Sequence, residues 1–264
     1  SYQPELVTGT KIKGRFLCDF CALFLIPPTT RRSGWKSRPS EFGIRNSELP
    51  PNPDERGGLK PCTVGLTGGL ATGTSTVARV LAAQGISVFD ADKVVHDLYE
   101  PGRAGAVAVS NLFGEAALDD GGGVSRATLS EMVLGNTSAR LRLESAIHPL
   151  VRKAVLEWLE SISDRAVAVV EASLLVETGS YRDYDVLMVV WCEQRQQMQR
   201  ALARGVPTER AHGLISAQLP MAEKKVLADI LVDNRGDLED LRPEVDRAWS
   251  QVHRLCAGRP THSE

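Results

Sequence analysis

The chain has 264 residues, 42% of them hydrophobic and 24% charged, which is typical of a globular protein large enough to bury a substantial core. Its formal net charge of −2 implies no general affinity for nucleic acid, and no apolar run approaches the roughly 18 residues that would indicate a membrane span. The cysteines are odd in number and scattered, which argues against a disulfide framework and for a reducing compartment, so we expect a cytoplasmic protein. They are Cys18, Cys21, Cys62, Cys192 and Cys256, and the single CxxC at Cys18 is interpreted as incidental because no second pair completes a zinc site.

The first 60 residues differ in composition from the rest. They contain ten Lys/Arg against six Asp/Glu, and eight of the fourteen prolines lie between Pro4 and Pro61. Little helical or strand periodicity is present there, and the one apolar run contains Asp19 and lacks a signal-peptidase site. We therefore expect residues 1–60 to be a disordered or incidental extension, 61–258 to form the folded domain, and 259–264 to be a short tail.

From residue 62 onward, short apolar runs alternate with helical stretches. The expected strands are 62–67, 86–89, 166–170, 186–191 and 230–232, and two of the helices between them are 75–84 and 193–203. Near-continuous apolar strands separated by helices indicate a parallel sheet covered on both faces. The stretch from about 93 to 163 is longer than a simple crossover and predicts a helical subdomain that covers a substrate.

A glycine-rich turn, GGLATGTST, joins the first strand to the next helix. Successive backbone N–H groups of such a turn can form a concave nest for an anion, and the helix adds the positive end of its dipole. The spacing G-x-x-x-x-G followed by Ser75 is typical of a phosphate loop, in which this hydroxyl binds Mg²⁺. A plain glycine-rich turn is the alternative. The residues expected to bind nucleotide are Gly68, Gly69, Leu70, Ala71, Thr72, Gly73, Thr74, Ser75 and Thr76.

Two aspartates follow the second strand in the run VFDADKVV. Carboxylates at the carboxyl end of a parallel strand lie where ligands bind in open α/β sheets. Asp92 can therefore take a proton from a substrate hydroxyl that faces the γ-phosphate of a nucleotide. The alternative is that Asp90 or Asp92 only caps a helix starting at Val94. Beside a phosphate loop we favour catalysis for Asp92 and a supporting or capping role for Asp90.

These and later motifs together resemble dephospho-CoA kinase. The resemblance covers residues 64–252 and is carried by VGLTGGLATGTSTVA, SVFDAD followed by EPG, LFG followed by SRATL, AIHPLVR, SLLVETG and AQLPMAEKKVLADILVDN. It implies an α/β, three-layer P-loop NTPase fold with a five-stranded parallel sheet, a helical CoA-binding subdomain and a lid over about 205–225. It also implies transfer of the ATP γ-phosphoryl group to the ribose 3′-hydroxyl of dephospho-CoA, with Mg²⁺, by a monomer or weak homo-oligomer.

The resemblance also implies roles for single residues. It makes Asp92 the base and places Asn234 in the adenine pocket. It makes Arg200 and Arg204 the lid arginines that clamp the transferring phosphate, and their i, i+4 spacing puts both on one helix face. A solvated basic stripe is the alternative for these arginines.

His148 belongs to the same set of inferred substrate contacts. It precedes Pro149, which suits the first position of a new helix, so His148 is expected at a helix N-terminus that contacts the acceptor. A capping or packing histidine is the alternative.

Two positions depart from the family pattern. Thr74 stands where the loop normally has lysine, which reaches the β- and γ-phosphates, and Ser173 stands where the family usually has proline. Losing one preorganised donor costs about 10²–10³ in rate, so we expect reduced activity with less effect on binding. Another lysine replacing the missing one, with Lys93, Lys224 and Lys225 nearest, is the less favoured possibility.

The leading interpretation is thus a kinase that completes coenzyme A synthesis. A catalytically inactive nucleotide- or CoA-binding protein with the same fold is the main alternative. A kinase for another small hydroxyl compound is disfavoured by the HPL and ADILVDN segments, and a GTPase by the lack of an NKxD-type stretch.

Overall fold

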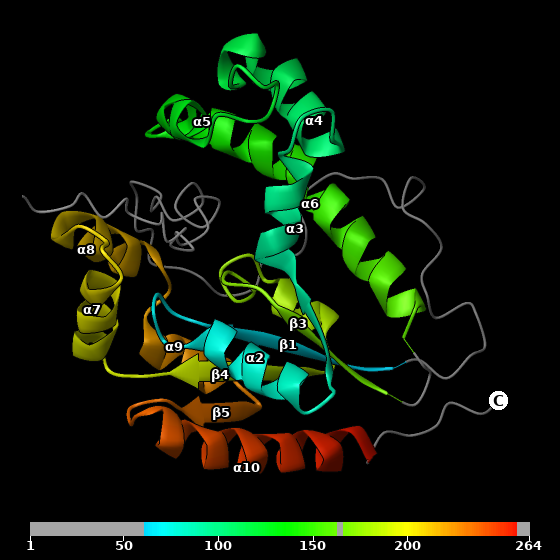
Figure 1. Cartoon of the computed structure of the whole chain (residues 1–264), viewed down its shortest axis with the longest axis vertical. Coiled ribbons are helices and arrows are strands. Elements are labelled where there is room, and N and C mark those ends of the chain that lie inside the picture. The colour runs from blue at the N-terminus through cyan, green and yellow to red at the C-terminus, as the bar shows by residue number, and fades with distance from the viewer. Residues whose placement is uncertain (1–60, 163–165, 258–264) are drawn as a thin grey trace, which may run out of the picture.

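The computed structural model describes residues 61–162 and 166–257, so the predictions for residues 1–60 and for the tail lie outside it. Short strands and helices alternate along this part of the chain (Figure 1). In chain order the elements are β1 Cys62–Gly68, α2 Thr74–Ala83, β2 Ser87–Asp90, α3 Ala91–Leu98, α4 Ala104–Phe113, η2 Glu115–Ala117, α5 Arg126–Val133, α6 Thr137–Glu160, β3 Val167–Glu171, η3 Ser180–Asp183, β4 Val186–Trp191, α7 Gln194–Ala203, α8 Thr208–Ala217, α9 Met221–Leu227, β5 Ile230–Asp233 and α10 Leu238–Ala257.

Within the described residues the strands form one five-stranded sheet in the order β2-β3-β1-β4-β5. Every neighbouring pair is parallel, which confirms the predicted sheet. Strand β4 shows why the prediction worked: Val186 to Val190 are all buried, because helices cover both faces of a parallel strand. The carboxyl ends of all five strands therefore meet at one edge.

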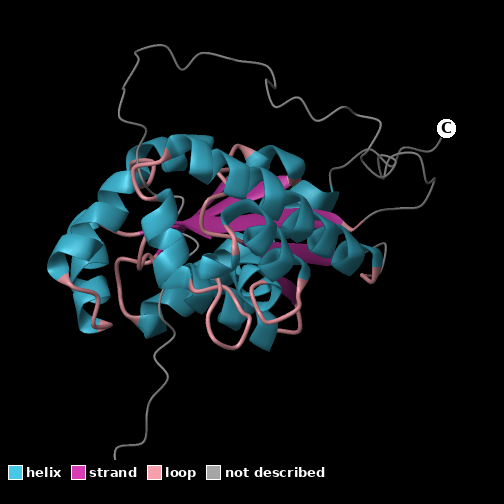
Figure 2. Ribbon diagram, turned by 90° about the horizontal axis from the view of Figure 1, so that it is seen from above, coloured by secondary structure: helices cyan, strands magenta, loops and turns pink. Residues whose placement is uncertain are grey.

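Helices lie on both faces of this sheet (Figure 2). On one face α2 and α10 enclose the main core, which includes Leu66, Leu81, Met188, Ile230 and Leu241. On the other face the second half of α6 packs on β3, and α9 contacts β4. This gives the three-layer arrangement that the sequence predicted.

The chain between β2 and β3 forms the predicted helical part, of which α4, α5 and the start of α6 stand away from the sheet in Figure 1. Helices α3 to α6 enclose a separate apolar cluster that includes Tyr99, Val109, Leu129, Leu143 and Ile147. Burial of these side chains gives the helical part its own core, so it can present a surface beside the sheet edge without taking residues from the main core.

Two predicted helix starts are wrong. Helix α3 begins at Ala91 instead of Val94, because Asp90 is its N-cap and accepts a hydrogen bond from the N–H of Lys93 at 2.9 Å. No helix starts at Pro149, which lies inside α6, so His148 is an exposed residue in mid-helix and not at an N-terminus. Burial of Ile147 and Val155 on either side keeps α6 continuous although proline removes one of its hydrogen bonds.

The expectation against disulfides is also wrong, and the cysteines therefore no longer argue for a reducing compartment. Cys62, at the start of β1, is bonded to Cys256, near the end of α10, across 194 residues of sequence. The bond fastens the last helix to the central strand. Cys192 is a buried thiol, and Cys18 and Cys21 lie outside the described residues. None of the helices described is both long and apolar enough to cross a membrane.

Candidate functional site: the phosphate loop and the neighbouring strand ends

The predicted phosphate loop links β1 directly to α2. The turn depends on two left-handed residues, Ala71 with φ 55° and Gly73 with φ 101°. Gly73 is also the N-cap of α2, and a Cβ there would collide with the side-chain amide of Asn234. Glycine is therefore required at this position for both its backbone conformation and its lack of a side chain.

Several backbone N–H groups are available where the loop enters α2. The first N–H groups of a helix have no intrahelical partner, and in α2 the first hydrogen bonds to the carbonyl of Gly73 come from the N–H groups of Thr76 and Val77. Among the described residues no acceptor is present for the N–H groups of Gly73, Thr74 or Ser75. Three successive donors at a helix N-terminus form a site for an anion.

The other end of the loop is occupied by its own neighbours. The N–H of Gly69 donates to the Thr72 hydroxyl at 3.1 Å, and the N–H of Leu70 donates to Oε1 of Gln218 at 2.7 Å. Leu70 and Ala71 are buried against residues of α7 and α8, so the predicted lid packs on this part of the loop. Only the half of the loop next to α2 is thus left to bind phosphate.

Asn234 supports the loop from the end of β5. Its Nδ2 donates to the carbonyl of Thr72 at 2.6 Å, and its own N–H donates to the carbonyl of Trp191 at 2.9 Å. The Asn234 side chain is buried, so this hydrogen bond is shielded from water and is stronger than the same bond at the surface. A role for Asn234 in the adenine pocket stays a prediction, whereas its contact with the loop is direct.

Lys224, on α9, lies beneath the loop. It is fully buried, and its Nζ donates to the carbonyl of Gly68 at 2.8 Å and pairs with Oε1 of Glu177 at 2.6 Å. The same Glu177 oxygen accepts from the N–H of Leu219 at 3.1 Å. The bonds reach a carbonyl and a carboxylate, so Lys224 braces the base of the loop and its charge is already paired.

The uncharged Thr74 side chain points back toward the start of the loop. Its hydroxyl is 3.4 Å from the Thr72 hydroxyl, and it would lie 2.7 Å from a Cβ placed on Gly68. Of the three lysines considered as replacements, Lys93 is exposed on α3 and Lys225 lies over the Trp191 ring at 3.4 Å. Lys224 is the one with a bond to the loop.

Asp92 lies in the first turn of α3, beside the end of β3. The side-chain hydroxyl of Ser173 donates to Asp92 Oδ2 at 2.6 Å. Asp90, which caps α3, pairs in register with Glu171, the last residue of β3. Both aspartates therefore lie at the carboxyl edge of the sheet, as the sequence predicted. Asp90 ends β2 and caps α3, and Asp92 lies just beyond the strand in the first turn of α3.

Three residues of this site were not predicted as site residues, although Ser173 had been noted for its departure from the family pattern. Glu171 is buried at 8% exposed and adds a carboxylate at the same edge, and its only local signal was an acid that ends an apolar run. Ser173 and Glu177 follow it in the turn after β3. Nothing near them in the sequence indicates Asp92 or Lys224 as partners, because each pair is made by the tertiary fold.

The two predicted arginines lie at the end of α7. Arg200 Nη2 donates to the carbonyl of Gly236 at 3.2 Å, two residues after Asn234, and its Nη1 is buried without a hydrogen-bond partner in the described part of the chain. Burial raises the pKa of the Cys192 thiol beside it, and the Arg200 guanidinium acts in the opposite direction. Arg204 follows the last turn of α7 and is exposed. Their joint action on a phosphate stays a prediction.

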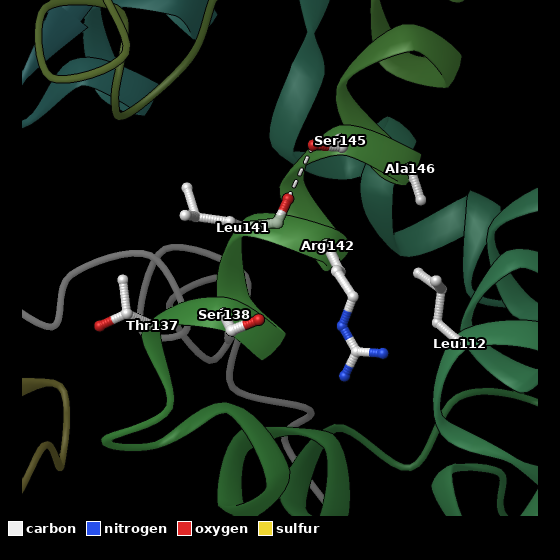
Figure 3. Close-up of a pocket in the computed structure, with 7 residues that line it drawn as sticks. All are labelled: Leu112, Thr137, Ser138, Leu141, Arg142, Ser145 and Ala146. Atoms are coloured by element: carbon white, nitrogen blue, oxygen red, sulfur yellow. Dashed lines mark hydrogen bonds between the residues drawn. The ribbon is translucent and has the colours of Figure 1, made fainter. Parts of the chain in front are cut away.

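The helical part contains a hollow of its own, between α4 and the first half of α6 (Figure 3). The Arg142 side chain extends between Leu112 and Ser138, and the Ser145 hydroxyl donates to the carbonyl of Leu141 at 2.8 Å. These residues belong to the helical part and not to the loop or strand ends. The hollow is therefore separate from the site built around Gly73 and Asp92.

Comparison with known proteins gives one consistent result. The model of the CoaE dephospho-CoA kinase family matches residues 62–240. A dephospho-CoA kinase of Methylococcus capsulatus is 41% identical over 195 residues, covering 74% of this chain and 98% of the relative. One of Frankia casuarinae is 36% identical over 190 residues, covering 72% and 83%. The crystal structure of TT1252 from Thermus thermophilus is similar with a TM-score of 0.62 and 28% identity, covering 74% of this chain and 97% of that one.

Proposed function

We propose, for a chain that belongs to the dephospho-CoA kinase family, that it transfers the γ-phosphoryl group of ATP to the ribose 3′-hydroxyl of dephospho-CoA in the cytoplasm. Membership of the family confirms the resemblance inferred from the motifs. The observation that carries the proposal for this chain is the position of its loop amides and Asp92 at the same edge of one parallel sheet.

The nucleotide side of the reaction rests on the start of α2. The N–H groups of Gly73, Thr74 and Ser75 would hold the phosphates, supported by the helix dipole. The Ser75 hydroxyl is exposed and bonded to no described residue, which fits a hard oxygen ligand for Mg²⁺. When bound, Mg²⁺ would offset the charge on the β- and γ-phosphates. No group of three or more acidic, His or Cys side chains in the described residues forms a separate metal site.

The acceptor side rests on Asp92. Its carboxylate would take the proton of the 3′-hydroxyl as that oxygen attacks the γ-phosphorus and ADP leaves. The helical part between β2 and β3 stands next to this edge and would bind the rest of dephospho-CoA. Arg200 and Arg204 would stabilise the transferring phosphoryl group, with the Arg200 Nη1 as the donor without a partner in the described residues.

One observation favours a second function. Thr74 places no charge at the position from which a loop lysine reaches the phosphates, and Lys224 has its charge paired with Glu177. A protein with the family fold that binds nucleotide or CoA without catalysis is therefore the alternative. We propose reduced, acceptor-dependent turnover rather than none, because the backbone donors and Asp92 are in place.

The test measures ADP formation with and without dephospho-CoA, for the chain as it stands and for Asp92→Asn. Turnover that depends on the acceptor and falls by about 10²-fold or more in Asp92→Asn supports the kinase. Nucleotide binding without acceptor-dependent turnover supports the binding protein. An Asp92→Asn variant as active as the starting protein would overturn the assignment of the base.

A further inference from the structure

The bond between Ser173 and Asp92 joins two residues that are 81 positions apart. Its length of 2.6 Å is typical of a hydroxyl that donates to an ionised carboxylate, the stronger class of hydrogen bond. The position is also one of the two at which this sequence departs from the family pattern. The contact is therefore made by a side chain that the expected proline does not have.

The sheet register explains why these two residues meet. Strands β2 and β3 are parallel neighbours, and Asp90 pairs with Glu171 at their carboxyl ends. Asp92 and Ser173 each follow two residues after that pair. Neighbouring strands lie about 4.8 Å apart, and the hydrogen bond from Ser173 to Asp92 shows that the two chains are still close just beyond the strand ends.

Both ends of the bond are held by rigid neighbours. On the Ser173 side, the N–H of Ala172 donates to the carbonyl of Leu66 at 3.1 Å, and the Leu174 side chain that follows is buried. On the other side, the Asp90 cap fixes the start of α3 and so fixes the backbone of Asp92. With both backbones held, the hydrogen bond from Ser173 acts on the rotation of the Asp92 side chain, together with the other contacts of Asp92.

We propose that Ser173 is a positioning residue that holds the Asp92 carboxylate in the orientation needed to accept the proton of the acceptor alcohol, an inference that rests on the proposed function. A carboxylate accepts about four hydrogen bonds, so the bond to Oδ2 does not use up its capacity to receive the alcohol. Ser173 acts through Asp92 and does not touch the reacting atoms. A base displaced by about 1 Å can lose about 10²-fold in rate, so correct orientation affects kcat.

The test compares Ser173→Ala with Ser173→Thr. Ser173→Ala is expected to lower kcat about tenfold with the KM for ATP unchanged, whereas Ser173→Thr, which keeps the hydroxyl, retains most of the activity. Ser250→Ala is the matched control, because that exposed hydroxyl donates to the carbonyl of Asp246 within α10. Each variant is measured alone and with Thr74→Lys, so that a slow starting rate does not hide the effect.

A double-variant comparison separates this inference from the proposed function. Ser173→Ala added to Asp92→Asn is expected to cause no further loss, because the two residues act as one unit. If Asp92→Asn is inactive while Ser173→Ala keeps full kcat, the positioning role is wrong and the kinase assignment stands. If Asp92→Asn has no effect on turnover, the assignment of the base is wrong and the positioning role of Ser173 is wrong with it. If ADP formation by the starting protein does not depend on dephospho-CoA, the proposed function itself is wrong.

A structural measurement decides the matter even without turnover. A crystal structure of Ser173→Ala is expected to show the Asp92 carboxylate rotated or in more than one orientation. An unchanged Asp92 side chain in that variant would overturn the inference.

Discussion

The brace beneath the phosphate loop gives a stability prediction that follows directly from burial. Lys224→Met removes a fully buried ammonium group, its 2.6 Å ion pair with Glu177 and its hydrogen bond to the carbonyl of Gly68. Methionine fills a similar volume, so the change isolates the loss of charge from the loss of packing. Glu177 is left without its cation and Gly68 without a donor from this side chain.

The expected cost comes from the environment of the pair. Removing one partner of a buried ion pair destabilises a protein by about 3–5 kcal/mol. The Glu177 side chain is 17% exposed, so water can solvate part of the remaining charge, and we expect the lower end, about 3 kcal/mol. For a domain of this size that corresponds to a fall in Tm of about 6–12 °C.

Urea unfolding followed by circular dichroism measures this free energy. Lys153→Met is the matched control: its ammonium group is 73% exposed and 3.8 Å from Glu157, so its loss should cost less than about 1 kcal/mol. Glu177→Leu combined with Lys224→Met should be more stable than Lys224→Met alone, because no unpaired charge remains. If Lys224→Met were as stable as Lys153→Met, the brace would not exist as described.

Three further predictions concern the loop, the disulfide and a half-buried tyrosine. Thr74→Lys should raise kcat at least tenfold in the ADP-formation assay, and an unchanged rate would mean that the phosphate charge is balanced elsewhere. Cys256→Ser should lower the free energy of unfolding by about 2–4 kcal/mol in non-reducing buffer, and stability that is unaffected by a reductant would contradict a bond to Cys62. Burial raises the pKa of Tyr184 to about 12 from 10.0, so the unfolded chain loses the phenol proton at a lower pH than the folded protein does. The free energy of unfolding should therefore fall as the pH rises from 10 to 12, by at most about 1.4 kcal/mol per pH unit. In Tyr184→Phe this alkaline decline should be shallower, and an equal decline in both proteins would refute the assignment.

The sheet could be predicted because its signal is local. Each strand of a covered parallel sheet is a short apolar run, and β4 was placed at 186–191 without error. The glycine-rich turn and the aspartates after β2 were found for the same reason, since their spacing along the chain carries the chemistry. The prediction of the fold thus depended on sequence patterns of fewer than about ten residues each, and the structure confirms it.

The errors arose where tertiary contacts override local rules. Pro149 was taken for a helix start, but burial of residues on both sides keeps α6 continuous through it. Cys62 and Cys256 are 194 residues apart, and only the packing of α10 against the sheet brings them together. Lys224 stands in a polar run, EKK, that indicates a solvated helix, yet it is the largest fully buried side chain of the described residues.

We propose that main-chain amides of the loop hold a nucleotide although the loop has no lysine. Calorimetric titration with a non-hydrolysable ATP analogue and Mg²⁺ tests it on the chain as it stands, on Thr74→Lys and on Gly73→Ala. We expect Thr74→Lys to bind more tightly by no more than about 100-fold, the upper range for one charge-assisted hydrogen bond, and Gly73→Ala to abolish binding because its Cβ would meet the Asn234 side-chain amide and distort the turn. No binding by the starting protein, or full binding by Gly73→Ala, would contradict the claim.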